Sequence, residues 1–157
     1  MVLGLLYVLV PPNISSVRSA IPLQQFQYDS LIALRDQAER LGEYPASALV
    51  IYKDSIIGAG YNTFRSLNDP LGHAEINALK AVFRSMDYFE FRALSRDSLI
   101  LISSFEPCPM CKGVINHLEI RRINYLERKR INYRIKYELD DLRYYLRIRR
   151  NRPPADQ

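Results

Sequence analysis

Cysteine and histidine are both scarce in this chain. Its 157 residues include two cysteines, Cys108 and Cys111 in one Cys-x-x-Cys segment, and two histidines, His73 and His117. A single pair of cysteines at this spacing cannot build a disulfide framework, which excludes the disulfide-stabilised secreted domains. We therefore expect a cytoplasmic protein whose thiols are reduced and available to a metal.

Long apolar runs are also missing. Residues 1–10, MVLGLLYVLV, are apolar but too few to cross a bilayer, and no positive residue precedes them as it would in a secretion signal. We expect no association with a membrane. We assign residues 1–26 to an N-terminal arm or extension and residues 27–157 to one domain, since the chain has no repeat, low-complexity tract or internal linker.

The composition is that of a soluble globular domain, with 48% hydrophobic and 25% charged residues. The net charge of +5 is unevenly spread, because residues 121–157 hold 12 Lys and Arg against 5 Asp and Glu. The preceding residues are slightly acidic. A basic tail is typical of a protein with a polyanionic partner, and a solvated helix surface is the other interpretation.

Apolar residues recur with two different periods along the chain. Stretches with helical spacing alternate with short apolar or alternating stretches that are typical of strands. This order favours an α/β fold, a three-layer α-β-α sandwich with a mixed, partly parallel central sheet. The predicted elements are a helix over 27–42, strands 46–53 and 56–61 joined across Asp54-Ser55, a helix over 73–86, a strand over 98–105, a helix from Pro107 to about His117, a strand over 121–127 and a last helix over 137–150.

Two short segments, His73-Ala-Glu75 and Pro107-Cys-Pro-Met-Cys111, supply the chemistry of a metal site. Cys108 and Cys111 are three residues apart at a predicted helix start, which places both sulfurs on one face of the first turn, where a helix favours thiolates. His73 begins another predicted helix. We infer that the two helix N-termini face each other with one Zn²⁺ between them. Two thiolates and one imidazole leave a fourth position open, as in catalytic zinc sites.

Glu75 is the remaining ionisable group of this cluster. Side chains two residues apart on a regular helix do not face the same way, so Glu75 can share the metal site with His73 only at the helix tip. A carboxylate there is placed to act as general base toward water and to carry the proton to a ring nitrogen and the departing amine. The predicted reaction is hydrolytic attack on a carbon that bears an exocyclic amine.

Two other interpretations of the Cys-x-x-Cys segment fit less well. A thioredoxin-like redox site needs a later proline opposite the cysteines, and the next prolines after Pro109 are Pro153 and Pro154 in the tail. A structural zinc site needs a fourth protein ligand. His117 lies six residues past Cys111, on the other side of that helix, and we expect it at the surface or at a dimer contact.

These residues resemble a known family, the cytidine and deoxycytidylate deaminase superfamily, over about residues 27–127. The likeness is to the branch of the tRNA-specific adenosine deaminases and guanine deaminases. It implies a cytidine deaminase-like fold, one Zn²⁺ per chain and Glu75 as the catalytic proton carrier. The segments that carry it are Gly58-Ala-Gly-Tyr-Asn62, Asp69-Pro70, His73-Ala-Glu-Ile-Asn-Ala-Leu79 and Phe105-Glu-Pro-Cys-Pro-Met-Cys111.

The resemblance also implies a homodimer and a contact between Asn62 and the substrate base. On the residues alone, a turn former is the favoured interpretation of Asn62 after Gly-Tyr. In the tail, Arg143, Arg147 and Arg150 share one stripe of the last predicted helix, which is similar to the basic C-terminal helix of the tRNA enzymes. We expect these arginines to contact nucleic acid, with a solvated helix surface as the alternative.

The leading function is therefore a hydrolase acting on the C–N bond of a nucleobase, with adenosine in tRNA converted to inosine. After the cysteine helix this chain lacks a longer, small-residue segment of the tRNA enzymes that it resembles. An alternative therefore stays open, a deaminase of a free base or nucleoside such as guanine, cytosine or cytidine. A non-catalytic, zinc-stabilised nucleic-acid-binding protein is the second alternative. Glu75 argues against it, because a structural site has no use for an unligated carboxylate.

The role of the tail can be tested by replacing Arg143, Arg147 and Arg150 with glutamine. If they contact phosphates, RNA binding should weaken and the slope of log K against log salt should fall by roughly 0.7–0.9 for each arginine. Filter binding or fluorescence anisotropy across a salt series measures both. An unchanged slope would favour a small-molecule substrate.

Overall fold

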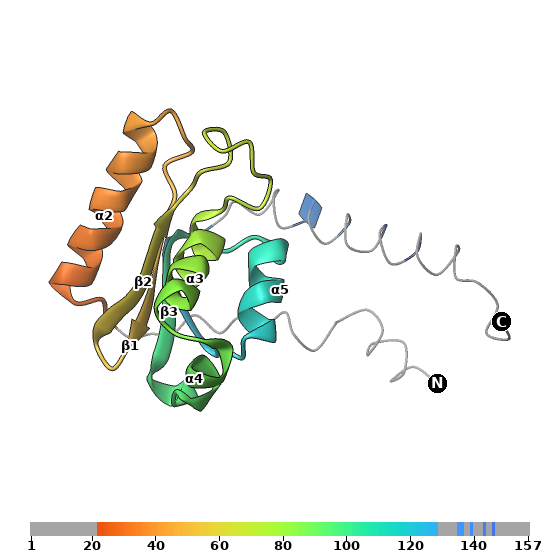
Figure 1. Cartoon of the computed structure of the whole chain (residues 1–157). Helices are drawn as coiled ribbons and strands as arrows, with labels where there is room; N and C mark the ends of the chain where they lie inside the picture. The colour runs from red at the N-terminus through yellow and green to blue at the C-terminus, as the bar shows by residue number, and fades with distance from the viewer. Residues whose placement is uncertain (1–21, 129–134, 137–138, 140–142, 144–145, 147–157) are drawn as a thin grey trace, which may run out of the picture. The chain divides into compact units, whose positions relative to one another are not determined.

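The computed structural model describes residues 22–128 and, in the tail, residues 135–136, 139, 143 and 146 (Figure 1). The chain divides into two compact units, Met1–Glu127 and Arg128–Gln157. The described tail residues are helical, as predicted for 137–150 where the two sets overlap. The other residues of that helix, and most of the predicted N-terminal arm, lie outside the described residues. Among those described, no helix is long and apolar enough to cross a bilayer.

The first unit is built on a four-stranded sheet in the order β2-β1-β3-β4. β1 runs antiparallel to β2 and to β3, whereas β3 and β4 are parallel. The mixed, partly parallel sheet is therefore as predicted. The strands are β1 (Ser47–Tyr52), β2 (Ser55–Tyr61), β3 (Leu99–Phe105) and β4 (Arg122–Glu127).

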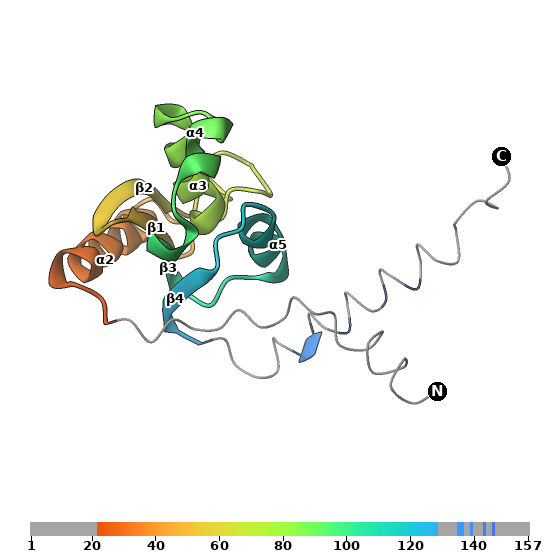
Figure 2. The same cartoon turned by 90° about the horizontal axis from the view of Figure 1, so that it is seen from below.

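Both faces of the sheet are covered, as β1 illustrates. Leu49 and Ile51 pack with Leu31 of helix α2 on one face, whereas Ala48 and Val50 join the larger core under α3 and α5 on the other. The alternation of a strand thus fills both layers. Figure 1 and Figure 2 show α2 on one side of the sheet and α3 and α5 on the opposite side, which is the predicted three-layer sandwich. The long helices are α2 (Gln25–Arg40), α3 (Ala74–Ser85) and α5 (Pro109–His117).

The β1–β2 hairpin turns slightly earlier than predicted. Its two turn residues are Lys53 and Asp54, with φ of 46° and 66°. Two left-handed residues in succession match the twist of the flanking strands in a two-residue hairpin, which is the physical reason for the shift. Ser55, expected in the turn, is instead the first residue of β2.

A short helical segment between α3 and β3 is absent from the predicted order. Helix α4 (Tyr88–Ala93) and the 3₁₀ turn η1 (Arg96–Ser98) occupy this region. Asp87 caps α4 by accepting from the backbone N–H of Glu90 at 2.9 Å, while the Glu90 carboxylate accepts from the Asp87 N–H at 2.8 Å. Phe91 is fully buried, so the segment closes one end of the core.

Helix α3 lies unusually close to β2, and Gly60 makes the approach geometrically feasible. A Cβ at Gly60 would lie 2.4 Å from the Ala78 backbone nitrogen and 2.8 Å from the Ala74 carbonyl oxygen. Both are backbone atoms of α3, which cannot move aside as a flexible side chain can. Because α3 begins directly after His73, this contact fixes the position of the helix tip that bears the predicted metal ligand.

We expect Gly60→Ala to lower the free energy of unfolding by about 1–3 kcal/mol, because the new methyl group pushes α3 away from the sheet. Gly113→Ala is a matched control. Gly113 lies inside α5 with open space around it, so an alanine there should raise stability by about 0.5–1 kcal/mol. Urea unfolding measures both changes, and equal effects of the two substitutions would refute the close-approach argument.

Candidate metal centre

The strand ends that lead into the candidate site lie together at one edge of the sheet. Ser47, at the start of β1, pairs with Tyr61 at the end of β2, and Ala48 pairs with Ser103 near the end of β3. The chain continues from β2 through Asn62 toward α3, and from β3 toward α5. Residues far apart in sequence therefore converge at this edge.

The two helices begin with the same backbone geometry. His73 directly precedes α3 in an extended conformation (φ −76°, ψ 149°), and Cys108 directly precedes α5 in a similar one (φ −73°, ψ 167°). Pro109 follows at the first helical position, where its missing N–H leaves no intrahelical bond unmade. Cys111 lies in the first turn of α5. The structure thus brings both helix tips together, as the spacing of the two motifs predicts.

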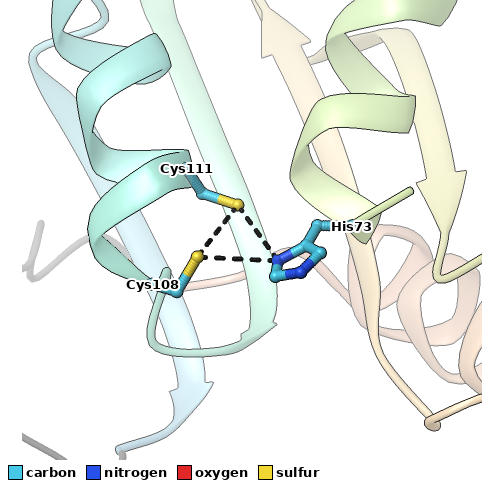
Figure 3. A group of neighbouring side chains, drawn as sticks. All are labelled: His73, Cys108 and Cys111. Atoms are coloured by element: carbon cyan, nitrogen blue, oxygen red, sulfur yellow. Dashed lines mark hydrogen bonds between the residues drawn. The ribbon is translucent and has the colours of Figure 1, made fainter. Parts of the chain in front are cut away.

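The three predicted ligands form a compact triangle (Figure 3). His73 Nδ1 lies 3.5 Å from both Cys108 Sγ and Cys111 Sγ, and the two sulfur atoms are 3.5 Å apart. Tetrahedral Zn²⁺ with bonds of about 2.3 Å to sulfur and about 2.0 Å to nitrogen separates its ligand atoms by roughly 3.6–3.8 Å. The donor set and its size therefore fit zinc. Among the residues that the structure describes, no other group of three such side chains could hold a metal.

The two thiols differ in acidity although they are neighbours. The interaction with the Cys111 sulfur, helped by the adjacent His73 ring, lowers the pKa of Cys108 to about 3. That same interaction, with burial and the nearby Glu75 carboxylate, raises the pKa of Cys111. The lowered pKa favours the thiolate form of Cys108 at the N-terminus of α5, where the helix also favours negative charge. A coordinated cation deprotonates a thiol directly, so Cys111 becomes the second anionic ligand when metal binds.

Glu75 lies in the first turn of α3 and is only 7% exposed. Its Oε2 accepts from Cys111 Sγ at 3.5 Å, and Ser103 Oγ lies 3.3 Å from its Oε1. Burial raises the pKa of Glu75 above its usual range, and the negative charge of Cys108 adds to the rise. The side chain therefore reaches the ligand triangle from the helix tip. A carboxylate with a raised pKa accepts and returns a proton more readily at neutral pH.

Asn62 is also buried at this edge, at 8% exposure, but its observed partner was not among the predicted site residues. Its Nδ2 donates to Glu43 Oε2 at 2.9 Å. Glu43 follows the end of α2 and is 4% exposed. No signal in the sequence marks Glu43, because a glutamate just past a helix end is normally solvated. Ser103 was also missed, because it lies in a strand that is otherwise mostly apolar.

The remaining predicted residues lie apart from the triangle or outside the description. His117 is exposed at the end of α5, in agreement with a surface position. Arg143 is helical and exposed within the second unit. Arg147 and Arg150 lie outside the described residues, so their predicted contact with nucleic acid stays a prediction.

Comparison with known proteins gives consistent matches. Residues 24–127 match the family described as the cytidine and deoxycytidylate deaminase zinc-binding region. The chain is 36% identical over 110 residues to the tRNA-specific adenosine deaminase of Haemophilus influenzae, a match that covers 69% of this chain and 60% of that protein. It is 35% identical over 71 residues to the guanine deaminase of Bacillus subtilis, covering 45% of this chain and 42% of that protein. The chain thus spans less than two thirds of either relative.

A solved structure from a study of A-to-I editing by tRNA:A34 deaminases at the wobble position of transfer RNA is similar in fold. It superposes with a TM-score of 0.57 at 25% identity and covers 65% of this chain and 75% of that one. This match agrees with the predicted α-β-α sandwich.

The ligand triangle predicts about one zinc per chain, as measured by inductively coupled plasma mass spectrometry of protein purified without chelators. His73→Ala should remove most of the zinc, because two thiolates alone hold the ion weakly. His117→Ala is the matched control, and it should leave the zinc content unchanged since His117 lies outside the triangle. Zinc-free native protein, or equal loss in both variants, would contradict the assignment.

Proposed function

Because the chain belongs to the cytidine and deoxycytidylate deaminase zinc-binding family, we propose that it is a zinc-dependent hydrolytic deaminase of a nucleobase. The reaction replaces an exocyclic amine by oxygen and releases ammonia. The observation that carries the proposal is the buried carboxylate of Glu75 beside the triangle of His73, Cys108 and Cys111. Zinc, when bound by these three ligands, supplies the activation of a water molecule for hydrolytic attack.

In this proposal Glu75 acts first as general base and then as general acid. Its carboxylate takes one proton from the attacking water and delivers it to a ring nitrogen, and it then transfers the second proton of that water to the amine, which leaves as ammonia. The raised pKa that burial gives Glu75 suits both steps, because the group must hold the proton and then release it. A buried carboxylate that is not needed as a ligand has no function in a purely structural zinc site. Its presence supports the enzyme over the non-catalytic nucleic-acid-binding alternative.

The proposed substrate is adenosine in tRNA, converted to inosine. The similarity to the tRNA-specific adenosine deaminase of Haemophilus influenzae supports this choice, and the basic composition of residues 121–157 suits a polyanionic substrate. Asn62 is the proposed contact to the base, and Arg143, Arg147 and Arg150 are the proposed contacts to phosphate. The similarity to the guanine deaminase of Bacillus subtilis supports the second candidate, a free purine base.

We propose further that the enzyme is a cytoplasmic homodimer, in which residues 27–157 form the deaminase domain with its basic C-terminal helix and residues 1–26 form an arm. Reduced thiols are required at the metal triangle, which suits the cytoplasm. We propose the groove of about 470 Å³ between α3 and α5 as the surface where the second copy docks, and light scattering would test the dimer. It is lined by Ile76, Leu79, Lys80, Phe83, Arg84, Val114, His117 and Leu118.

Glu75→Gln keeps the shape of the side chain and removes its capacity to accept a proton. We expect kcat to fall by about 10²–10⁴-fold while the zinc content stays that of the unmodified chain. Glu39→Gln, at an exposed site on α2, is the matched control and should leave kcat unchanged. Ammonia release and metal analysis on the same preparations measure both quantities. Full turnover by Glu75→Gln would remove Glu75 from the proposed mechanism.

The substrate is tested by an ammonia-release screen across free bases, nucleosides, nucleotides and a tRNA anticodon stem-loop. Turnover confined to the stem-loop supports the tRNA proposal, whereas turnover of guanine supports the second candidate. Absence of ammonia from every substrate, with zinc bound, would overturn the deaminase proposal.

A further inference from the structure

A second buried glutamate, Glu43, is saturated with hydrogen-bond donors at the same sheet edge. Its Oε2 accepts from Asn62 Nδ2 at 2.9 Å and from the backbone N–H of Arg65 at 3.1 Å. Its Oε1 accepts from the backbone N–H of Ser66 at 2.5 Å. A buried carboxylate is stable only when such donors replace its lost hydration. All three donors belong to one short segment, which follows β2.

That segment is anchored on its other side to the helix of the metal triangle. The Thr63 N–H donates to the Gly72 carbonyl at 2.8 Å, directly before His73. Asn77 of α3 donates through Nδ2 to the Tyr61 carbonyl and to Thr63 Oγ1, both at 2.8 Å. Asn62 therefore stands between two fixed supports, Glu43 on one side and α3 on the other. Of the two, Glu43 is the one that contacts the Asn62 side chain.

The chemistry of this contact decides which way the Asn62 amide points. An ionised carboxylate accepts hydrogen bonds and cannot donate them, so the NH₂ group of the amide has to face Glu43. Burial acts to raise the pKa of Glu43, but the hydrogen bonds from Ser66, Arg65 and Asn62 outweigh it and hold the pKa below its usual range. Glu43 is thus ionised at neutral pH. The amide then has its oxygen and one N–H left for another partner.

We propose that Glu43 is a positioning residue that locks the Asn62 amide in one orientation and so determines which hydrogen-bonding groups meet the substrate base. This inference rests on the proposed function, in which Asn62 contacts the base. A side-chain amide that is free to flip exchanges its acceptor for its donor. With the flip blocked, the site presents one fixed pattern to the base, and a base with the opposite pattern leaves buried polar groups unpaired.

A double-mutant cycle separates this role from simple support of the loop. We expect Glu43→Gln to lower kcat/KM about tenfold to a hundredfold, mainly through a higher KM, because the introduced amide lets Asn62 flip. Asn62→Ala should cost at least as much. The double variant should be no worse than Asn62→Ala alone, since Glu43 acts through Asn62. Independent, multiplicative losses would overturn the inference, because they would mean that Glu43 acts on the loop and not on the amide.

The controls separate a specific effect of Glu43 from a general effect of the substitution on folding or zinc binding. Glu39→Gln makes the same chemical change at an exposed site near the end of α2 and should leave kcat/KM unchanged. Melting temperature and zinc content are measured for every variant. If Glu43→Gln does not fold, Glu43→Asp takes its place in the cycle. It keeps the charge but withdraws the carboxylate by one methylene, so it should weaken the contact with Asn62 and give the same pattern in the cycle.

A second readout tests the contact without any turnover. In ¹⁵N-labelled protein the side-chain NH₂ signals of Asn62, assigned through Asn62→Ala, should shift on Glu43→Gln and stay in place on Glu39→Gln. Unchanged signals would overturn the role of Glu43. Failure of the unmodified chain to deaminate any substrate would instead overturn the proposed function, so the two failures are distinguishable.

Discussion

The site depends on one geometric constraint: two helix N-termini have to meet at the same edge of the sheet. His73 precedes α3 and Cys108 precedes α5, and their ligand atoms lie 3.5 Å apart although 35 residues separate them. The parallel β3-α5-β4 crossover places one tip, and the close packing of α3 on β2 at Gly60 places the other. A shift of either helix by an ångström would pull the ligand atoms apart. The chemistry of the site therefore depends on the packing of the core.

Three buried glutamates near this edge have different surroundings, which give the same type of side chain different properties. Glu43 is surrounded by donors, which lower its pKa. Glu75 is desolvated beside a thiolate, which raises its pKa. Glu106, between β3 and the first ligand cysteine, pairs with the Lys112 ammonium at 2.9 Å. Environment therefore lowers the pKa of Glu43 and raises that of Glu75, the proposed proton carrier, and the sequence letters alone cannot tell them apart.

What the sequence could predict follows from the range of the interactions involved. The ligands and Glu75 lie in two short motifs at helix starts, where local spacing already determines which side chains share a face. Glu43 and Ser103 escaped prediction because their partners, Asn62 and Glu75, are 19 and 28 residues away. Helix α4 was missed for a different reason, since its Asp87–Glu90 capping box precedes only six residues and leaves little periodicity to detect.

The loop next to the metal site suggests how one type of metal site can serve different substrates. The loop from Asn62 to Gly72 is closed at its base by the Thr63–Gly72 hydrogen bond, and its exposed part carries Phe64, Leu67 and Leu71. Changes at this exposed part can alter what the loop touches without moving His73, because the base of the loop holds the helix tip. Under the proposed function, the two motifs set the chemistry, and the loop that directly precedes His73, anchored through Glu43, sets the choice of substrate. Such a division is consistent with similarity to both a tRNA-specific adenosine deaminase and a guanine deaminase.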